Sequence, residues 1–66
     1  MNVIKALRER QGMSQSMLSQ KSGVKQQTIS MLETGERKMP RIDTAKKLAD
    51  ALGCTVDDLL KDAKAV

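Results

Sequence analysis

The sequence predicts an all-α, compact five-helix domain, and three observations support this prediction. Glycine or proline interrupts the 66-residue chain between five stretches that are long enough for short helices. Within these stretches, apolar residues recur at intervals of three and four, and no segment alternates with the two-residue period of a strand. At this length the chain should form a single domain, over residues 1–66.

Capping signals define the first two helices. The first should run from the N-terminus to Gly12, because glycine adopts at little cost the left-handed conformation that ends a helix. The second should begin at Ser14, a favoured N-cap. Met13 and Leu18 flank that cap at the spacing of a hydrophobic staple. We expect Ser19 to loosen this helix slightly.

The third and fourth helices flank a loop. The third should cover about residues 26–33 and end before Gly35, and Pro40 disfavours further helix in the loop that follows. The fourth should cover about residues 42–52. Its apolar stripe has clear helical spacing and consists of Ile42, Ala45, Leu48, Ala49 and Leu52.

The fifth helix has its own start signal. Thr55 is the expected N-cap, and Asp58 stands at the reciprocal capping position three residues later. The acidic side chains there also favour the positive end of the helix. Cys54, in an apolar position before this helix, is read as a small core residue in preference to a redox sensor. The pattern fades toward the C-terminus, so the tail at about 62–66 should fray.

Composition excludes several classes of function. The chain has no His, one Cys and no Phe, Trp or Tyr. It therefore lacks the ligands of a protein-only zinc site, an internal disulfide framework and a histidine-based triad, and base stacking on aromatics is disfavoured. No carboxylate pair has a catalytic context and no glycine-rich phosphate cradle is present, so we expect no enzyme, cofactor or metal. With no long apolar run for a membrane span or signal peptide, a cytoplasmic location is expected.

The positive charge is unevenly placed. The net charge is +4, and residues 1–41 hold eight basic and three acidic side chains, against four and five in residues 42–66. Such a distribution indicates one surface that faces a polyanion, although ordinary solvated charge is the open alternative.

Two short helices in this basic part have the spacing of a helix-turn-helix, over about residues 14–33. Gly23 permits the tight turn between them, and Val24 should pack into the core. In such a unit the second helix enters the DNA major groove. A plain helical hairpin with a glycine turn bears the same pattern.

The full ordered set of residues from Leu7 to Leu60 resembles the Cro/CI-type helix-turn-helix family of phage and bacterial transcriptional regulators, also called the xenobiotic-response-element family. The shared residues are Leu7-Arg8, Gly12-Met13-Ser14-Gln15, Leu18, Gly23-Val24, Gln26-Gln27-Thr28-Ile29-Ser30, Leu32-Glu33, Gly35, Pro40, Leu48-Ala49, Leu52-Gly53, Val56 and Leu59-Leu60. The resemblance implies a lambda-repressor-like fold and binding to double-stranded DNA.

The resemblance also assigns base contacts. Gln26 and Gln27 match the exposed start of the recognition helix, where the most similar phage repressors also have two glutamines that reach base edges. A glutamine amide can donate to adenine and accept from it at once. The alternative is a pair of solvated glutamines. Met31 departs from the usual polar residue, and it either packs on a thymine methyl group or folds back on the domain.

Phosphate contacts follow from the same comparison. Ser14 and Gln15 match the start of the second helix, where backbone N–H groups also attract phosphate. Lys25 replaces the usual capping residue, so that cap should be weak and the amine could reach a phosphate or a guanine edge. The remaining expected phosphate contacts are Thr28, Ser30, Lys38 and Arg41, of which Arg41 could also approach a narrow minor groove.

Two further pairs have structural roles. The family commonly pairs an Arg of the first helix with the Glu that ends the recognition helix, and Arg8 and Glu33 stand at these positions. We expect a partly buried ion pair. Since the chain shows no second domain, dimerisation should use the fifth helix, through Val56 and Leu60.

The leading hypothesis is a sequence-specific transcriptional regulator, in particular a repressor, that binds a near-palindromic operator as a homodimer. The alternative is an antitoxin or another protein-binding adaptor that uses the same scaffold, for which the protein partner is unknown.

Overall fold

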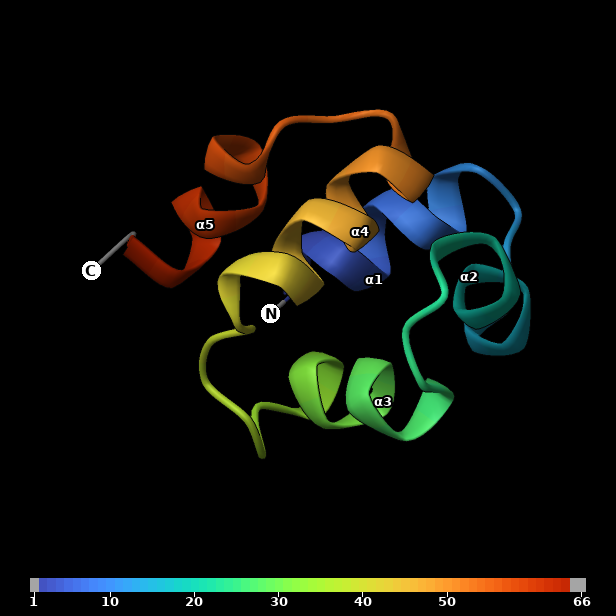
Figure 1. The fold of residues 1–66 in the computed structure, drawn as a ribbon, viewed down its shortest axis with the longest axis horizontal. Helices are drawn as coiled ribbons and strands as arrows, with labels where there is room; N and C mark the ends of the chain where they lie inside the picture. Colours follow the sequence, from blue (N-terminus) through green and yellow to red (C-terminus); the bar gives the residue numbers. More distant parts are fainter. Residues whose placement is uncertain (1, 65–66) are drawn as a thin grey trace.

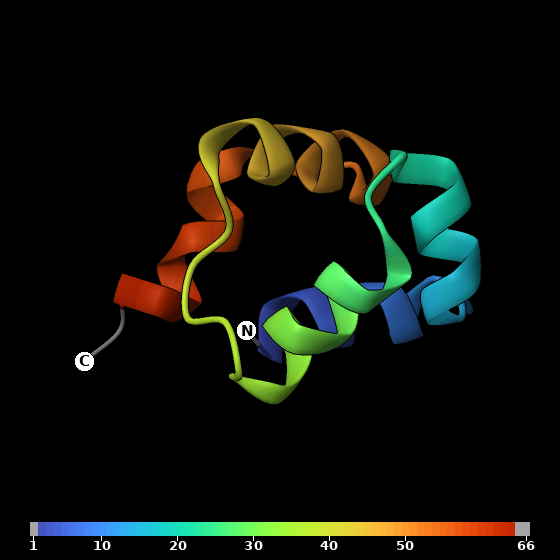
Figure 2. The same cartoon turned by 60° about the horizontal axis from the view of Figure 1, so that its bottom comes forward.

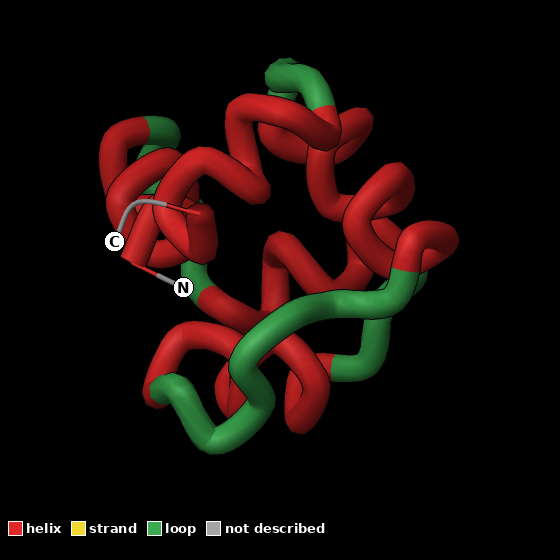
Figure 3. Tube along the Cα trace, turned by 90° about the vertical axis from the view of Figure 1, so that its left-hand side faces the viewer, coloured by secondary structure: helices red, strands yellow, loops and turns green. Residues whose placement is uncertain are grey.

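A computed structural model describes the backbone of residues 2–64 and the side chains of residues 3–60. The described residues form five helices: α1 (Asn2–Arg10), α2 (Gln15–Ser22), α3 (Gln26–Thr34), α4 (Ile42–Leu52) and α5 (Val56–Lys64) (Figure 1). Between residues 2 and 64 only helix and loop are found, with no strand (Figure 3). The predicted all-α, five-helix fold is confirmed.

The helices surround one aliphatic core. Each helix contributes at least one of the six largest fully buried side chains, which are Ile4, Leu18, Ile29, Leu32, Leu48 and Leu59. α2 packs against α3 and α4, while α5 packs against α1 and α4. α3 lies across the molecule from α4 and packs against α1 (Figure 2). Every helix therefore depends on packing against others, as expected for helices too short to be stable alone.

The start of α4 departs from the sequence prediction. The apolar stripe holds from Ala45 onward, but Ile42 is 73% exposed. Ile42 is the first residue of the helix and follows the loop after α3. The expectation that it joins the core stripe is wrong, because the buried face of α4 begins only at Ala45, one turn after Ile42.

The turn between α2 and α3 is held by two serines. The hydroxyl of Ser19 donates to the carbonyl of Val24 at 2.6 Å, and the Val24 N–H donates to the Ser22 hydroxyl at 3.1 Å. Gly23 has a φ of 78°, in the left-handed region, and its N–H donates to the Ser19 carbonyl at 2.8 Å. The Ser19 hydroxyl therefore closes the turn, and the expected loosening of α2 stays a prediction.

The N-terminal caps predicted for α2 and α5 are both present. The Met17 N–H donates to the Ser14 hydroxyl at 3.1 Å. At α5, the Thr55 N–H donates to the Asp58 carboxylate at 3.2 Å and the Asp58 N–H donates to the Thr55 hydroxyl at 3.1 Å. The backbone of residues 62–64 is helical and residues 65–66 lie outside the described residues, so fraying of the tail stays a prediction.

One cap was not anticipated from the sequence. The Gln11 side-chain amide donates to the carbonyl of Leu52 at 2.8 Å. Leu52 is the last residue of α4, so this bond satisfies one of the carbonyls that the helix cannot pair internally. It also ties the end of α1 to the end of α4.

The Ser19 hydrogen bond can be measured against a matched serine. Ser19→Ala removes the donor to Val24 and leaves its carbonyl short of a partner, whereas Ser16 lies exposed on the same helix. Both changes gain the same helix propensity, so their difference isolates the hydrogen bond. We expect Ser19→Ala to have a free energy of unfolding about 1 kcal/mol below that of Ser16→Ala, by urea titration followed by circular dichroism. Equal values would contradict a closing role for Ser19.

Candidate nucleic-acid interface

α3 has one face fixed in the core and one face open. Ile29 and Leu32 are fully buried, which sets the rotation of the helix about its axis. Gln26 and Gln27 occupy the first turn and are exposed, so the same rotation presents both amides outward. A side chain that reads a base edge must extend from a helix held in this way, because groove contact leaves little tolerance in position.

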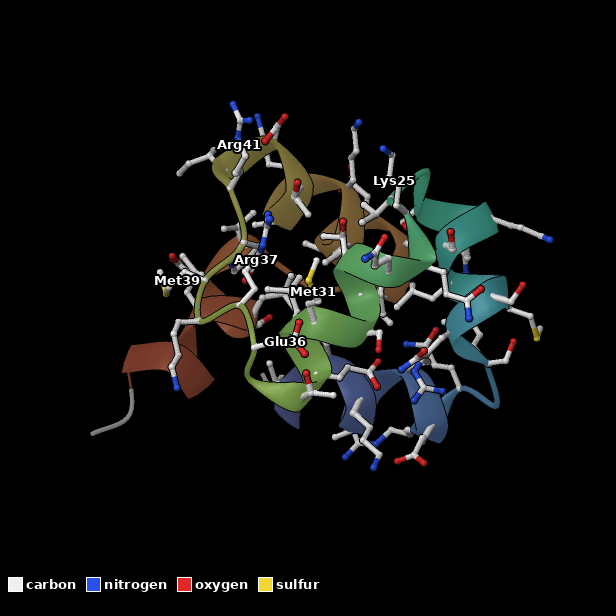
Figure 4. All side chains as sticks on the ribbon, turned by 90° about the horizontal axis from the view of Figure 1, so that it is seen from below. Lys25, Met31, Glu36, Arg37, Met39 and Arg41 are labelled. Carbon is white, nitrogen blue, oxygen red and sulfur yellow. The ribbon has the colours of Figure 1, made fainter. Side chains whose placement is uncertain are left out.

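The first turn of α3 has no acidic residue to compensate the positive end of the helix dipole. Lys25 precedes the helix with an extended ψ of 138°, and its side chain forms no cap hydrogen bond. This agrees with the weak cap expected from the sequence. Lys25 is exposed and lies at the N-terminal end of α3 (Figure 4). The first N–H groups of a helix have no partner within the helix. Helix end and amine together favour an anion here.

The loop after α3 folds back along the same face. The Arg37 N–H donates to the Met31 carbonyl at 3.0 Å, and the Thr34 hydroxyl donates to the same carbonyl at 3.3 Å. Gly35 ends the helix with a φ of 87°. The loop therefore brings Arg37 beside Met31, and Arg41 follows at the start of α4 (Figure 4).

The side chains on this face differ in accessibility. Those of Lys25, Gln26, Gln27, Lys38 and Arg41 are exposed, whereas Thr28, Ser30 and Met31 are half-buried. Part of the Met31 side chain therefore packs on the domain and part remains exposed, and its contact with a thymine methyl group stays a prediction. The face consists of two glutamines bordered by cations at the start of α3 and in the loop after it.

Below this face, an ion pair joins α1 to α3. Arg8 donates from Nε to Glu33 Oε2 at 2.9 Å and from Nη2 to Glu33 Oε1 at 3.0 Å, so the pair is bidentate. The side chains are 11% and 5% exposed. Arg8 Nη1 also donates to the Met13 carbonyl at 2.8 Å. The ion pair expected between these residues is present, and it reaches the turn before α2 as well.

The start of α2 joins the same network. Gln15 is half-buried and its Nε2 donates to Glu33 Oε1 at 3.1 Å. The sequence analysis predicts a phosphate contact for Gln15, whereas in the structure its amide donates to an acceptor within the protein. Since an amide nitrogen carries two N–H groups, one remains for a further acceptor. Ser14 is exposed beside it and accepts the N-terminal capping bond.

The network sets the charge states of its members. Burial acts to raise the pKa of Glu33, but hydrogen bonds from Arg8 and Gln15 and the positive charges of Arg8 and Lys5 outweigh it, so the pKa is lowered. The hydrogen bond to Glu33 raises the pKa of Arg8, against the opposing effect of burial. Both groups are therefore charged at neutral pH.

The remaining candidate residues lie away from this face. Val56 and Leu60, expected at a dimer contact, are half-buried and pack against the core. Cys54 is half-buried in the same way, and burial together with the nearby Asp58 carboxylate raises the pKa of its thiol. Among the described residues, no group of three or more His, Cys, Asp or Glu side chains is placed to hold a metal ion. No helix in the described part of the chain has the length and apolarity to cross a membrane.

Comparison with known proteins assigns the sequence to a family. Residues 4–59 match a family model described as helix-turn-helix. The chain belongs to the Cro/CI-type helix-turn-helix family of DNA-binding transcriptional regulators. It is 38% identical over 60 residues to the HTH-type transcriptional repressor RghR of Bacillus subtilis (strain 168), across 91% of this chain and 44% of that relative. The chain thus spans less than half the length of this relative. No solved structure matches it.

The structure also shows three side-chain contacts that the sequence analysis did not predict. Ser19 closes the turn, and Gln11 joins α1 to α4. The bond from Gln15 to Glu33 links the starting turn of α2 to the end of α3. A polar residue near a glycine turn could have indicated Ser19, whereas the partners of Gln11 and Gln15 are 41 and 18 residues away and left no local signal.

Removing the Glu33 carboxylate should be costly. In Glu33→Ala the Arg8 guanidinium stays largely buried without its carboxylate partner, so we expect the free energy of unfolding to fall by about 3–5 kcal/mol. Glu36→Ala is the control, because Glu36 is exposed in the loop, and its effect should stay within about 0.5 kcal/mol. Urea titration followed by circular dichroism measures both. A Glu33→Ala protein as stable as Glu36→Ala would show that the ion pair does not hold the helices.

The lowered pKa of Glu33 gives stability a defined dependence on pH. A glutamate in an unfolded chain has a pKa of about 4.3. Because the folded pKa of Glu33 is lower, its stabilising effect is complete above the unfolded pKa and is lost as the pH falls through the folded one. Acid titration should therefore destabilise the wild type more steeply below about pH 4 than it does Glu33→Gln, which has no charge to lose. Parallel pH profiles for the two proteins would contradict this assignment.

Proposed function

We propose that the protein reads a near-palindromic operator in double-stranded DNA as a homodimer and represses transcription from it. In each copy α3 enters the major groove and Gln26 and Gln27 contact base edges. The observation that carries this proposal is the exposure of both amides on a helix whose opposite face is locked by Ile29 and Leu32. A glutamine pairs with adenine through two hydrogen bonds, which supports a preference for A·T pairs.

Backbone contacts position this helix from both sides. Ser14 and Gln15 at the start of α2 are the proposed phosphate contacts on one side, with Lys25 close to the groove. Lys38 and Arg41 in the loop after α3 are those on the other side, and all three cations are exposed. Thr28 and Ser30, which are half-buried, are proposed as shorter-range phosphate contacts. Met31 completes the base-contacting set, with its open part toward a thymine methyl group.

The size of the domain supports a two-copy complex. Paired recognition helices of such dimers lie about 34 Å apart, one turn of B-DNA. The longest extent of one protomer is 30 Å between Cα atoms, so two adjacent copies fit consecutive turns. Val56 and Leu60 on α5 are the dimer contacts proposed from the sequence. Repression is proposed by analogy with RghR, whose name describes a transcriptional repressor.

Selection from random duplex DNA tests the proposal directly. The wild type should enrich a site with dyad symmetry, and recovery of single-stranded or asymmetric sequence would count against it. Gln27→Ala should lose about 1–3 kcal/mol of discrimination at one base position in each half-site. Gln20→Ala is a matched control, because Gln20 is an exposed glutamine on α2, outside the helix proposed to enter the groove.

A phosphate contact should behave differently from a base contact. Lys38→Ala should weaken binding to all sequences by a similar factor and reduce the dependence of affinity on salt by about one unit of slope. Lys46 on α4 is exposed, and Lys46→Ala should leave that slope nearly unchanged. Affinity titrations at several salt concentrations distinguish the two. A change in base preference with Lys38→Ala would assign this side chain to readout instead.

A further inference from the structure

The loop after α3 and the start of α4 expose apolar surface that no helix of the fold covers. Met39 is 49% exposed and Ile42 is 73% exposed. We name residues 39–42 the apolar edge. In two views the chain before α4 runs beside α5, at one end of the long axis of the molecule (Figures 1 and 2). α2 occupies the opposite end.

The residues that the sequence assigned to the dimer contact offer less free surface. Val56 and Leu60 are half-buried because they pack against the core of their own protomer. A self-association surface on α5 alone would therefore be short of apolar area. The apolar edge extends the same end of the molecule with two large side chains that are open.

We infer that the apolar edge is the main apolar contact with a second copy of this chain. The inference rests on the proposed function, since that function requires two copies on one operator. The edge follows the loop that borders α3, so a contact there joins the two copies beside the DNA-facing surface. In this arrangement Met39 and Ile42 form most of the apolar dimer contact, in place of Val56 and Leu60.

The charges on either side of Ile42 suit a symmetric contact. Arg41 and Asp43 carry opposite charges and are 80% and 69% exposed. Within one chain they lie 3.8 Å apart, a loose pair between well-solvated groups. A two-fold axis near Ile42 would bring Arg41 of one copy toward Asp43 of the other, and the guanidinium, with its five N–H donors, can contact a phosphate at the same time. A homodimer contact has this self-complementary character, whereas a surface of one charge would repel its own copy.

The available area predicts a dimer that forms mainly on DNA. A stable interface buries roughly 800 Å² on each partner, which would be about a fifth of the 4287 Å² surface of this protomer. The apolar edge offers two large exposed apolar side chains, Met39 and Ile42, while Val56 and Leu60 on α5 are half-buried. Association in free solution should therefore be weak, and an operator that holds both copies should promote it through a high effective concentration.

The first test uses no DNA. Methyl NMR spectra of the wild type are recorded from about micromolar to millimolar concentration. The expected result is a concentration-dependent shift centred on Met39 and Ile42, with Met17 as the internal control because it is 52% exposed at the far end of the fold. Shifts centred on Met17, or no shift at millimolar concentration, would overturn the inference.

The second test compares a full operator with a single half-site, both taken from the duplex selection. The variant Met39→Thr/Ile42→Thr keeps the charge of the loop and changes only exposed side chains, so folding and half-site affinity should be retained. Cooperative affinity for the full site should fall by about tenfold or more, since two copies of each apolar side chain leave the interface. Met17→Thr is the control and should bind as the wild type does.

The outcomes separate the inference from the proposed function. Unchanged cooperativity in the double threonine variant would overturn the apolar edge as a self-contact while DNA binding stands. Wild-type protein that binds half-sites independently would overturn it too. If no duplex is selected at all, the proposed function fails, and the methyl shifts then decide the self-contact alone.

Discussion

The bidentate ion pair between Arg8 and Glu33 is the contact on which the proposed DNA-facing surface depends. One carboxylate accepts hydrogen bonds from α1 and from the start of α2 while it belongs to α3. The same guanidinium also holds the carbonyl before the α2 cap. Three helices and one turn thus share a single charged centre. Taking two charges out of water is expensive, and full satisfaction of their hydrogen bonds is what offsets that cost.

This charged centre fixes the orientation of the helices relative to one another more than it adds to the net stability of the fold. Aliphatic packing can be satisfied by several similar arrangements of short helices, since the contacts are not directional. A bidentate pair accepts a narrow range of distances and angles. Together with the serine-closed turn between α2 and α3, the pair fixes how far Gln26 and Gln27 project relative to the start of α2. Readout of a groove requires this fixed relation between the helix that contacts bases and the elements that contact phosphates.

The small aliphatic core limits what else the domain can do. With no aromatic side chain, burial comes from Leu, Ile, Val, Ala and Met, and all five helices are needed to enclose it. Little apolar surface is left for a partner. The apolar edge at Met39 and Ile42 is consistent with a protein that associates weakly by itself and more strongly where DNA places two copies together. Weak association in free solution would make operator occupancy depend steeply on protein concentration.

The sequence by itself determined the five helices, the caps at Ser14 and Thr55, the helix-turn-helix spacing and the outward glutamines. These features depend on residues within a turn or two of one another, where propensity and periodicity act. The Arg8–Glu33 pair was also predictable, but only through resemblance to a family. Tertiary structure alone decided the partners of Gln11 and Gln15 and the exposure of Ile42. Helical spacing can show that Ile42 shares a face with Ala45, but only the positions of the other helices determine how far along that face the core extends.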